Sequence, residues 1–63
     1  MMDEAYLLAQ RAYILAIEAE IQGMIALNQY RIQRDETIAY DEEAFYSRAE
    51  ELKSIHEQIM RNR

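Results

Sequence analysis

Seven small residues recur at helical spacing through the first half of the chain. The gaps between them alternate between four and three residues, which places all seven along one side of a helix. They are Ala5, Ala9, Ala12, Ala16, Ala19, Gly23 and Ala26, and we call them the small-residue stripe. Small side chains let two helix backbones approach more closely than the usual separation of about 8–10 Å. The stripe therefore predicts a packing surface, although alanine is also simply a good helix former.

The first helix carries other apolar residues as well. A set of large side chains lies almost opposite the small-residue stripe: Leu7, Ile14, Ile17, Ile21 and Met24. The second half of the chain predicts a helix with a single apolar stripe, made of Phe45, Ala49, Leu52, Ile55 or His56, and Ile59. One apolar stripe buries one face. The second helix therefore covers only part of the first, and the small-residue stripe needs another partner.

Few residues interrupt the helical pattern, because the chain has no Pro and a single Gly. We expect a helix near 3–34, a short connection near 35–40 and a second helix near 41–61, within one domain spanning 1–63. Asp41 is a suitable N-cap for the second helix, and Tyr40 with Phe45 is a candidate hydrophobic staple. The predicted fold class is all-α, an antiparallel two-helix hairpin that assembles into a homo-oligomeric helical bundle.

Chain length supports the oligomer. A domain of 63 residues buries only about 60% of its unfolded surface and is marginal alone. The chain has no Cys, which excludes disulfides as the supplement that small folds need. Because most soluble oligomers are symmetric, the expected partner is the chain itself, as a dimer or a higher even-numbered homo-oligomer.

The charged residues disfavour nucleic acid and membranes as partners. The net charge is −5, which disfavours general binding to nucleic-acid phosphates. The apolar first half is interrupted by Arg11, Glu18 and Glu20, which makes insertion into a membrane costly. The N-terminus opens acidic, unlike a secretory signal. These features predict a cytoplasmic protein without membrane contact.

No pattern of catalytic residues is present. The chain lacks a Gly-rich phosphate loop, and its serines have no local nucleophile context. His56 is the only histidine, and Lys53 stands three residues before it, where a di-iron bundle requires Glu. The sequence therefore predicts a protein that is not an enzyme, with no metal and no cofactor.

Two regions have the chemistry of binding surfaces. Aromatic, amide and guanidinium groups gather near the connection, at Asn28, Tyr30, Arg31, Arg34, Thr37 and Tyr40. Such groups suit a small anionic ligand, unless the arginines pair with nearby acids and the tyrosines pack the hairpin end. The second helix offers an acidic face for a protein partner, at Glu43, Glu50, Glu51 and Glu57. The alternative there is a solvated face with i,i+4 ion pairs.

Residues 19–45, AEIQGMIALNQYRIQRDETIAYDEEAF, resemble short helical-hairpin proteins encoded by bacteriophages, which carry an AEIxGMxAxN helix, a short tip and an AYxExxF helix start. Asp35 and Glu36 stand where that pattern has a Gly-containing tip. The resemblance implies an anti-defence protein that inhibits a host protein or sequesters a host nucleotide signal.

The expected function is therefore that of a non-catalytic homo-oligomeric binding protein. It would hold a small anionic ligand, similar to a cyclic nucleotide, at pockets between subunits. The alternatives are an inhibitor or adaptor that binds a host protein through the acidic face, and a purely structural assembly subunit.

Overall fold

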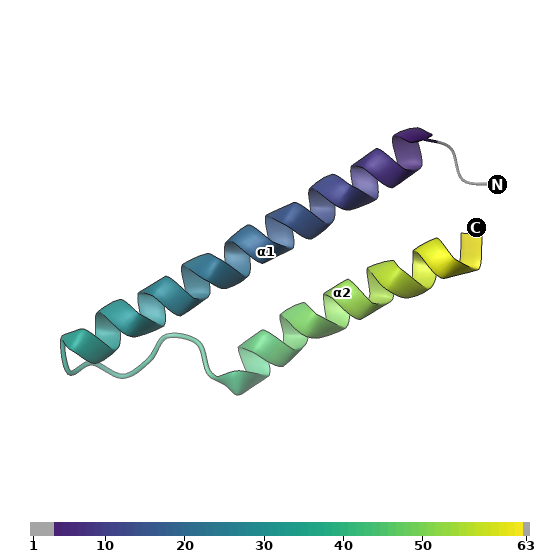
Figure 1. Ribbon diagram of the computed structural model, residues 1–63. Helices are drawn as coiled ribbons and strands as arrows, with labels where there is room; N and C mark the ends of the chain where they lie inside the picture. The colour runs from purple at the N-terminus through teal and green to yellow at the C-terminus, as the bar shows by residue number, and fades with distance from the viewer. Residues whose placement is uncertain (1–3, 63) are drawn as a thin grey trace.

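Two antiparallel helices lie side by side in the computed structural model, which describes residues 4–62 (Figure 1). Helix α1 runs over Glu4–Gln33 and helix α2 over Glu42–Asn62, and both are packed against each other. The predicted all-helical hairpin is confirmed. The observed bounds differ from the expected ones by one residue at each described end, and residue 3, where the first helix was expected to begin, lies outside the described residues.

Helix α1 ends in a Schellman motif. The backbone N–H of Glu36 donates to the carbonyl of Arg31 at 2.8 Å, and that of Asp35 donates to the carbonyl of Ile32 at 3.1 Å. This motif requires a left-handed residue, and Asp35 adopts it with a φ of 61°. Gly is the residue that favours this position, and Asp is tolerated there at some cost in free energy.

Helix α2 begins at a capped end. The carboxylate Oδ1 of Asp41 accepts a hydrogen bond at 3.2 Å from the backbone N–H of Ala44, three residues later in the chain. This contact confirms Asp41 as the N-cap, because such a bond satisfies one of the free N–H groups of the first turn.

Asn28 ties the connection to α1. Its side-chain Oδ1 accepts hydrogen bonds from the backbone N–H groups of Ala39 and Tyr40, at 3.0 and 2.9 Å. Its Nδ2 donates to the carbonyl of Tyr40 at 2.8 Å. The side chain of Asn28 therefore fixes the path of the connection just before α2 begins, and the connection folds back beside the last turns of α1 (Figure 1).

The core of the hairpin is small. Among the described residues, the buried hydrophobic side chains are Ile17 and Met24 from α1 and Ile55 from α2. Half-buried apolar side chains surround them, at Ile14, Ile21, Phe45, Leu52 and Ile59. Ile55, and not its alternative His56, occupies the core position on α2, because His56 is exposed. Ala49, a predicted member of the same stripe, is also exposed, as is Leu7 on α1.

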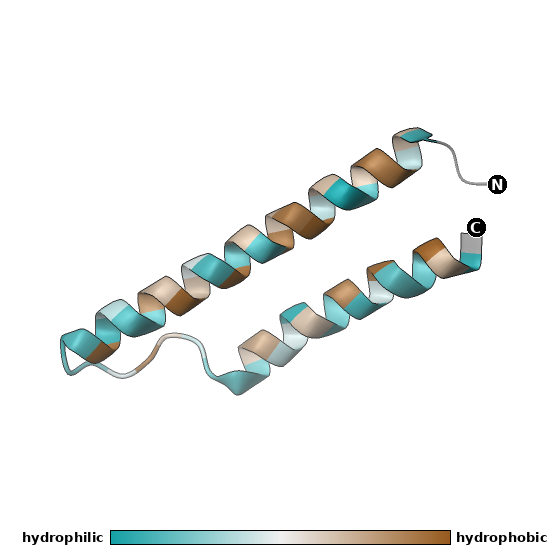
Figure 2. Cartoon of the chain, in the orientation of Figure 1, coloured by the Kyte–Doolittle hydropathy of each residue, from teal (hydrophilic) through white to brown (hydrophobic). Residues whose placement is uncertain are grey.

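The molecule is elongated and exposes much of its apolar surface. Its Cα atoms extend over 52 × 18 × 8 Å, and its accessible surface is 5210 Å². A compact monomer of 7.5 kDa has a surface of about 4,200 Å². The hairpin therefore exposes about 1,000 Å² more than a compact protein of its mass does. Figure 2 shows hydrophobic residues recurring along the whole length of α1.

Neither helix, within the part of the chain that the structure describes, combines the length and the apolar character needed to cross a membrane.

Candidate functional site: the outward face of helix α1

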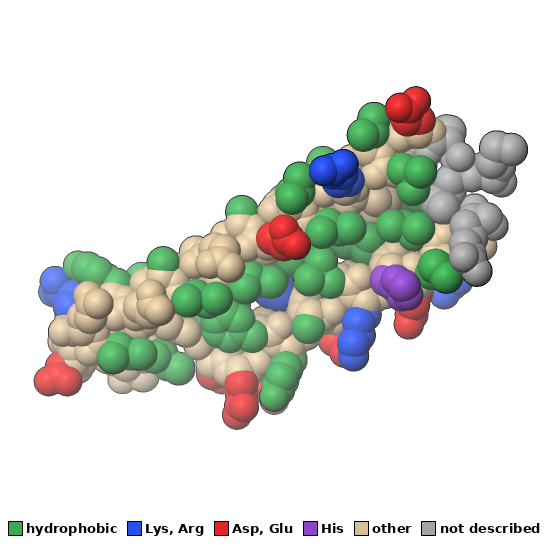
Figure 3. All heavy atoms as spheres, in the orientation of Figure 1, with side chains coloured by type: hydrophobic (Ala, Val, Ile, Leu, Met, Phe, Trp, Pro, Cys, Tyr) green, Lys and Arg blue, Asp and Glu red, His purple; other side chains and the backbone are tan. Residues whose placement is uncertain are grey.

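Most of the small-residue stripe faces away from α2, while Ala9 lies at its edge and also lines the groove between the helices. All seven of its members are exposed, and an added Cβ at Gly23 would meet no atom within 4 Å. Figure 3 shows hydrophobic side chains along the edge of α1 that is turned away from α2. The structure thus divides α1 into a side of large residues against α2 and a side of small residues in solvent.

Larger apolar residues flank the small-residue stripe. Leu8 is 59% exposed and Leu15 is 54% exposed on one side, and Leu27 is exposed on the other. We call the small-residue stripe together with Leu8, Leu15 and Leu27 the association face. The centre of this face carries no charge, because the stripe consists of Ala and Gly. A contiguous exposed apolar face of this kind is typical of an interaction surface in a soluble protein.

Charged residues border the association face. At 100° per residue, Arg11 and Glu18 fall beside Leu8 and Leu15, and Glu20 falls on the opposite edge beside Leu27. Arg11 and Glu18 are exposed, and within residues 4–62 neither forms an ion pair. Glu20, in contrast, is engaged by α2.

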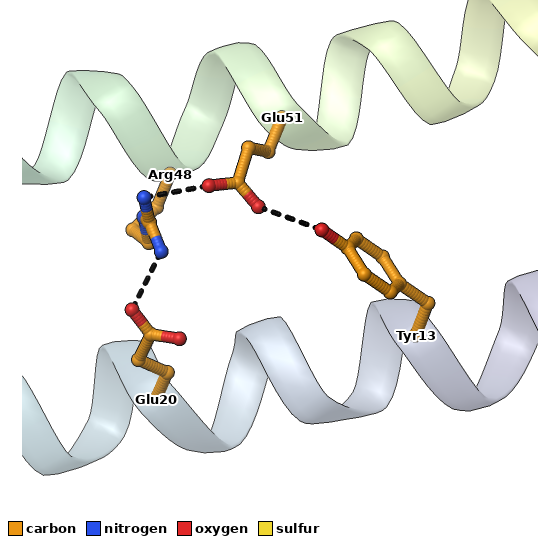
Figure 4. Close-up of polar contacts among 4 residues, drawn as sticks. All are labelled: Tyr13, Glu20, Arg48 and Glu51. Atoms are coloured by element: carbon orange, nitrogen blue, oxygen red, sulfur yellow. Dashed lines mark hydrogen bonds and ion pairs between the residues drawn. The ribbon is translucent and has the colours of Figure 1, made fainter.

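A polar network joins the two helices (Figure 4). Arg48 of α2 contacts Glu20 of α1 through Nη1 and Glu51 through Nη2, each at 2.6 Å. The hydroxyl of Tyr13 on α1 donates to the other carboxylate oxygen of Glu51 at 3.3 Å. The side chain of Arg48 is only 25% exposed, so this cation is held between two carboxylates at the edge of the core. The network fixes how α2 lies on α1.

Sequence reasoning did not identify this network. Arg48 occupies a position of the apolar stripe of α2, between Phe45 and Leu52, and that unusual placement is the signal that points to it. Glu51 was assigned to the acidic face, but the structure turns it toward α1. Of the remaining acidic-face residues, Glu50 lies 3.6 Å from Lys53, and Glu43 and Glu57 are exposed.

The structure divides the expected ligand residues near the connection into two groups. Asn28 and Tyr40 bond to each other as described, and Arg31 donates weakly to the carbonyl of Thr37 at 3.5 Å. Tyr30 and Arg34 form the second group, which lies farther around α1 toward the association face.

The Tyr30–Arg34 pair is stacked and exposed. The guanidinium carbon of Arg34 lies 5.3 Å from the centre of the Tyr30 ring, and its Nη1 donates to the Tyr30 hydroxyl at 3.1 Å. Glu36 is 3.4 Å from the Nε of Arg34 and competes for its charge. The pair offers a flat cationic surface, partly neutralised by its neighbour.

An open groove of about 400 Å³ runs between the helices. Its lining residues are Ala9, Gln10, Tyr13, Glu51, Ser54, Ile55 and Gln58. The one acidic group in the groove, Glu51, is already held by Arg48 and Tyr13. No group of three or more His, Asp or Glu side chains able to hold a metal ion occurs among the residues that the structure describes.

Comparison of the chain with models of protein families, with curated proteins and with solved structures found no match. The resemblance to phage hairpin proteins therefore stays a prediction.

Proposed function

We propose that the chain is a non-catalytic binding protein that works as a homo-oligomer, with the association face packed against the same face of a second copy. The observation that supports this proposal is the exposure of that face. The hairpin exposes about 1,000 Å² more surface than a compact monomer, and each partner of a standard interface buries about 800 Å². One interface of ordinary size would remove the excess.

The small core supports the same proposal. The three buried side chains within residues 4–62 give a two-helix hairpin little stabilisation, and helices without enough packed surface are marginal in water. Pairing two hairpins through this face would place the two α1 helices at the centre, each covered by α2 on one side and by the second α1 on the other, so that the apolar residues on both sides of α1 are covered. Folding and association are then coupled.

A carboxylate placed in the association face tests this function. Ala16→Glu would bury a charge between the helices, so we expect the oligomer to dissociate to a single chain in size-exclusion chromatography with light scattering. The matched control is Ala49→Glu, which introduces the same side chain at an exposed position of α2 and should leave the mass unchanged. Equal masses for the two variants would overturn the proposal.

The tip offers a second function, the capture of a small anionic ligand. The observation that favours it is the exposed stack of Arg34 on Tyr30, because a guanidinium binds phosphate and an aromatic ring stacks on a base. Sequestration of a host nucleotide signal, which the phage resemblance implies, would use this pair.

Titration calorimetry with cyclic AMP as the probe tests ligand capture. The wild-type chain should bind, and Arg34→Ala should lose binding. Lys53→Ala should retain it, because this substitution removes an equal charge from the exposed surface of α2, away from the tip. Absence of any heat with the wild-type chain would remove this ligand class from the tip.

A further inference from the structure

A shallow hollow lies along one edge of the association face. Its volume is about 390 Å³, and its lining residues are Leu15, Glu18, Ala19, Ile21 and Gln22. Four of these residues stand at positions i, i+3, i+4 and i+7 of α1. This is the set of four residues that forms a hole for one side chain of a facing helix. The carboxylate of Glu18 at the rim suits a cationic side chain.

The chain itself supplies a matching cation. Arg11 stands seven residues before Glu18, on the same edge of the association face, and its side chain is exposed. Its long aliphatic stem can lie on apolar residues while its guanidinium reaches a carboxylate. The geometry of one α1 helix therefore contains both halves of a self-complementary contact.

The orientation of the second copy follows from these edges. In an antiparallel pair, the two copies are related by a two-fold axis perpendicular to the helix axes. The Arg11–Glu18 edge of one copy then meets the same edge of the other. In a parallel pair, that edge meets the opposite edge, which carries Glu20. Leu15 and Glu18 would then lie against a carboxylate. The antiparallel pair places Arg11 beside Glu18, whereas in the parallel pair Glu18 meets Glu20, which Arg48 already holds.

Charge also selects the register. With Ala12 of one copy opposite Ala16 of the other, Ala9 faces Ala19 and Arg11 lies over the hollow beside Glu18. A shift of one heptad in one direction places Glu18 against Glu18, and the opposite shift places Arg11 against Arg11. Like charges at such positions repel.

We infer that two copies pair in antiparallel orientation through the association face, with Arg11 of each copy seated in the hollow of the other beside Glu18. This inference rests on the proposed self-association. It places Leu15 of one copy near Leu15 of the other, close to the two-fold axis. It also leaves the two tips at opposite ends of the dimer, so a ligand captured at a tip would contact one tip alone rather than a pocket shared between tips.

Disulfide trapping tests the orientation, because the chain has no Cys of its own. We expect a mixture of Ala9→Cys and Ala19→Cys chains to form a mixed disulfide dimer, and neither variant to form one with itself. In the antiparallel register, identical residues at position 9 are about ten residues apart along the helix axis, or about 15 Å. That separation exceeds the limit of about 7 Å between the Cα atoms of a disulfide.

Failure of self-association and failure of the antiparallel pairing would give different experimental results. A wild-type chain that is monomeric by light scattering overturns the proposed self-association and this inference together. An oligomer in which Ala9→Cys is linked to itself shows parallel pairing and overturns the inference alone. An oligomer that links Ala9→Cys to Ala26→Cys, and not to Ala19→Cys, shows a register shifted by one heptad, which also overturns it.

A charge exchange tests the Arg11–Glu18 contact itself. Arg11→Glu should raise the dissociation constant of the dimer about tenfold, because two symmetric contacts become repulsive. The double variant Arg11→Glu with Glu18→Arg should restore it to the wild-type value. Arg61→Glu changes the net charge equally at an exposed position of α2 and should have little effect. A double variant as weak as the single one would overturn the contact.

Discussion

The two sides of α1 are both apolar, but they are built from side chains of different size. The side against α2 carries Ile17 and Met24, which are 4% and 5% exposed and fill the space between the two helices. The opposite side carries alanines and Gly23, all in solvent. Large residues stabilise a contact by the surface they bury, whereas small residues stabilise one by letting backbones approach. If a second copy covers the small side, as we propose, one helix makes two contacts of different kinds.

Enlarging the small side should have the greatest effect. Replacing Ala12, Ala16 and Ala19 by Leu would overfill a close helix contact, at about 1–3 kcal/mol per site. We expect loss of the native mass in light scattering, while a single hairpin has room for the added atoms. An unchanged mass and an unchanged free energy of unfolding would mean that this side makes no close contact.

Shortening a large side chain on the side against α2 should have a smaller effect, and it should lower the free energy of unfolding. Ile17→Ala removes a buried side chain from the hairpin core, and the expected loss is about 2–4 kcal/mol in the free energy of unfolding. Urea denaturation followed by circular dichroism measures it. Ile32→Ala is the matched control, because it removes the same atoms from a side chain that is 60% exposed and lies outside the association face, and its loss should be small. An equal loss for Ile32→Ala and Ile17→Ala, measured at one chain concentration, would contradict the role of Ile17 in the core.

The polar network of Arg48, Glu20 and Glu51 should contribute less to the free energy of unfolding. Arg48→Met keeps the length of the side chain but leaves Glu20 and Glu51 without their shared cation. We expect a loss of about 1–2 kcal/mol in unfolding free energy, reduced by the partial exposure of the network. High salt should reduce the difference between wild type and variant. Lys53→Met serves as the control, because its ion pair with Glu50 is largely exposed.

The smallest effect should be a gain in stability. Asp35→Gly relieves the left-handed backbone at the end of α1, where Asp35 has a φ of 61°. The expected gain is about 1 kcal/mol in thermal or urea unfolding, with no change in mass. A loss of stability would show that the side chain of Asp35 has a role that its backbone does not explain.

Local signals in the sequence were sufficient for most of the hairpin. Asp41 is followed by two acids and an apolar residue, and it caps α2 as predicted. The absence of Pro and the regular helical spacing placed both helices within one residue of their described bounds. These features depend on interactions within a few residues, which a sequence displays directly.

Contacts between the helices were less predictable. Ile55 and His56 differ by 100° on the helix, and the choice between them depends on the exact rotation of α2 against α1. Glu51 is of a residue type that is usually exposed to solvent, but that same rotation brings it into contact with Tyr13 and Arg48. The side chain of Asn28, which was expected at a ligand site, bonds to the connection, and no local pattern revealed that contact.

Completion of the hairpin by a second copy is tested by measuring mass and helicity together over a dilution series. We predict an even multiple of the 7.5 kDa chain at high concentration, with helicity lost together with mass on dilution. A chain that stays fully helical and cooperatively folded at 7.5 kDa across the series would show that the hairpin is complete without a second copy.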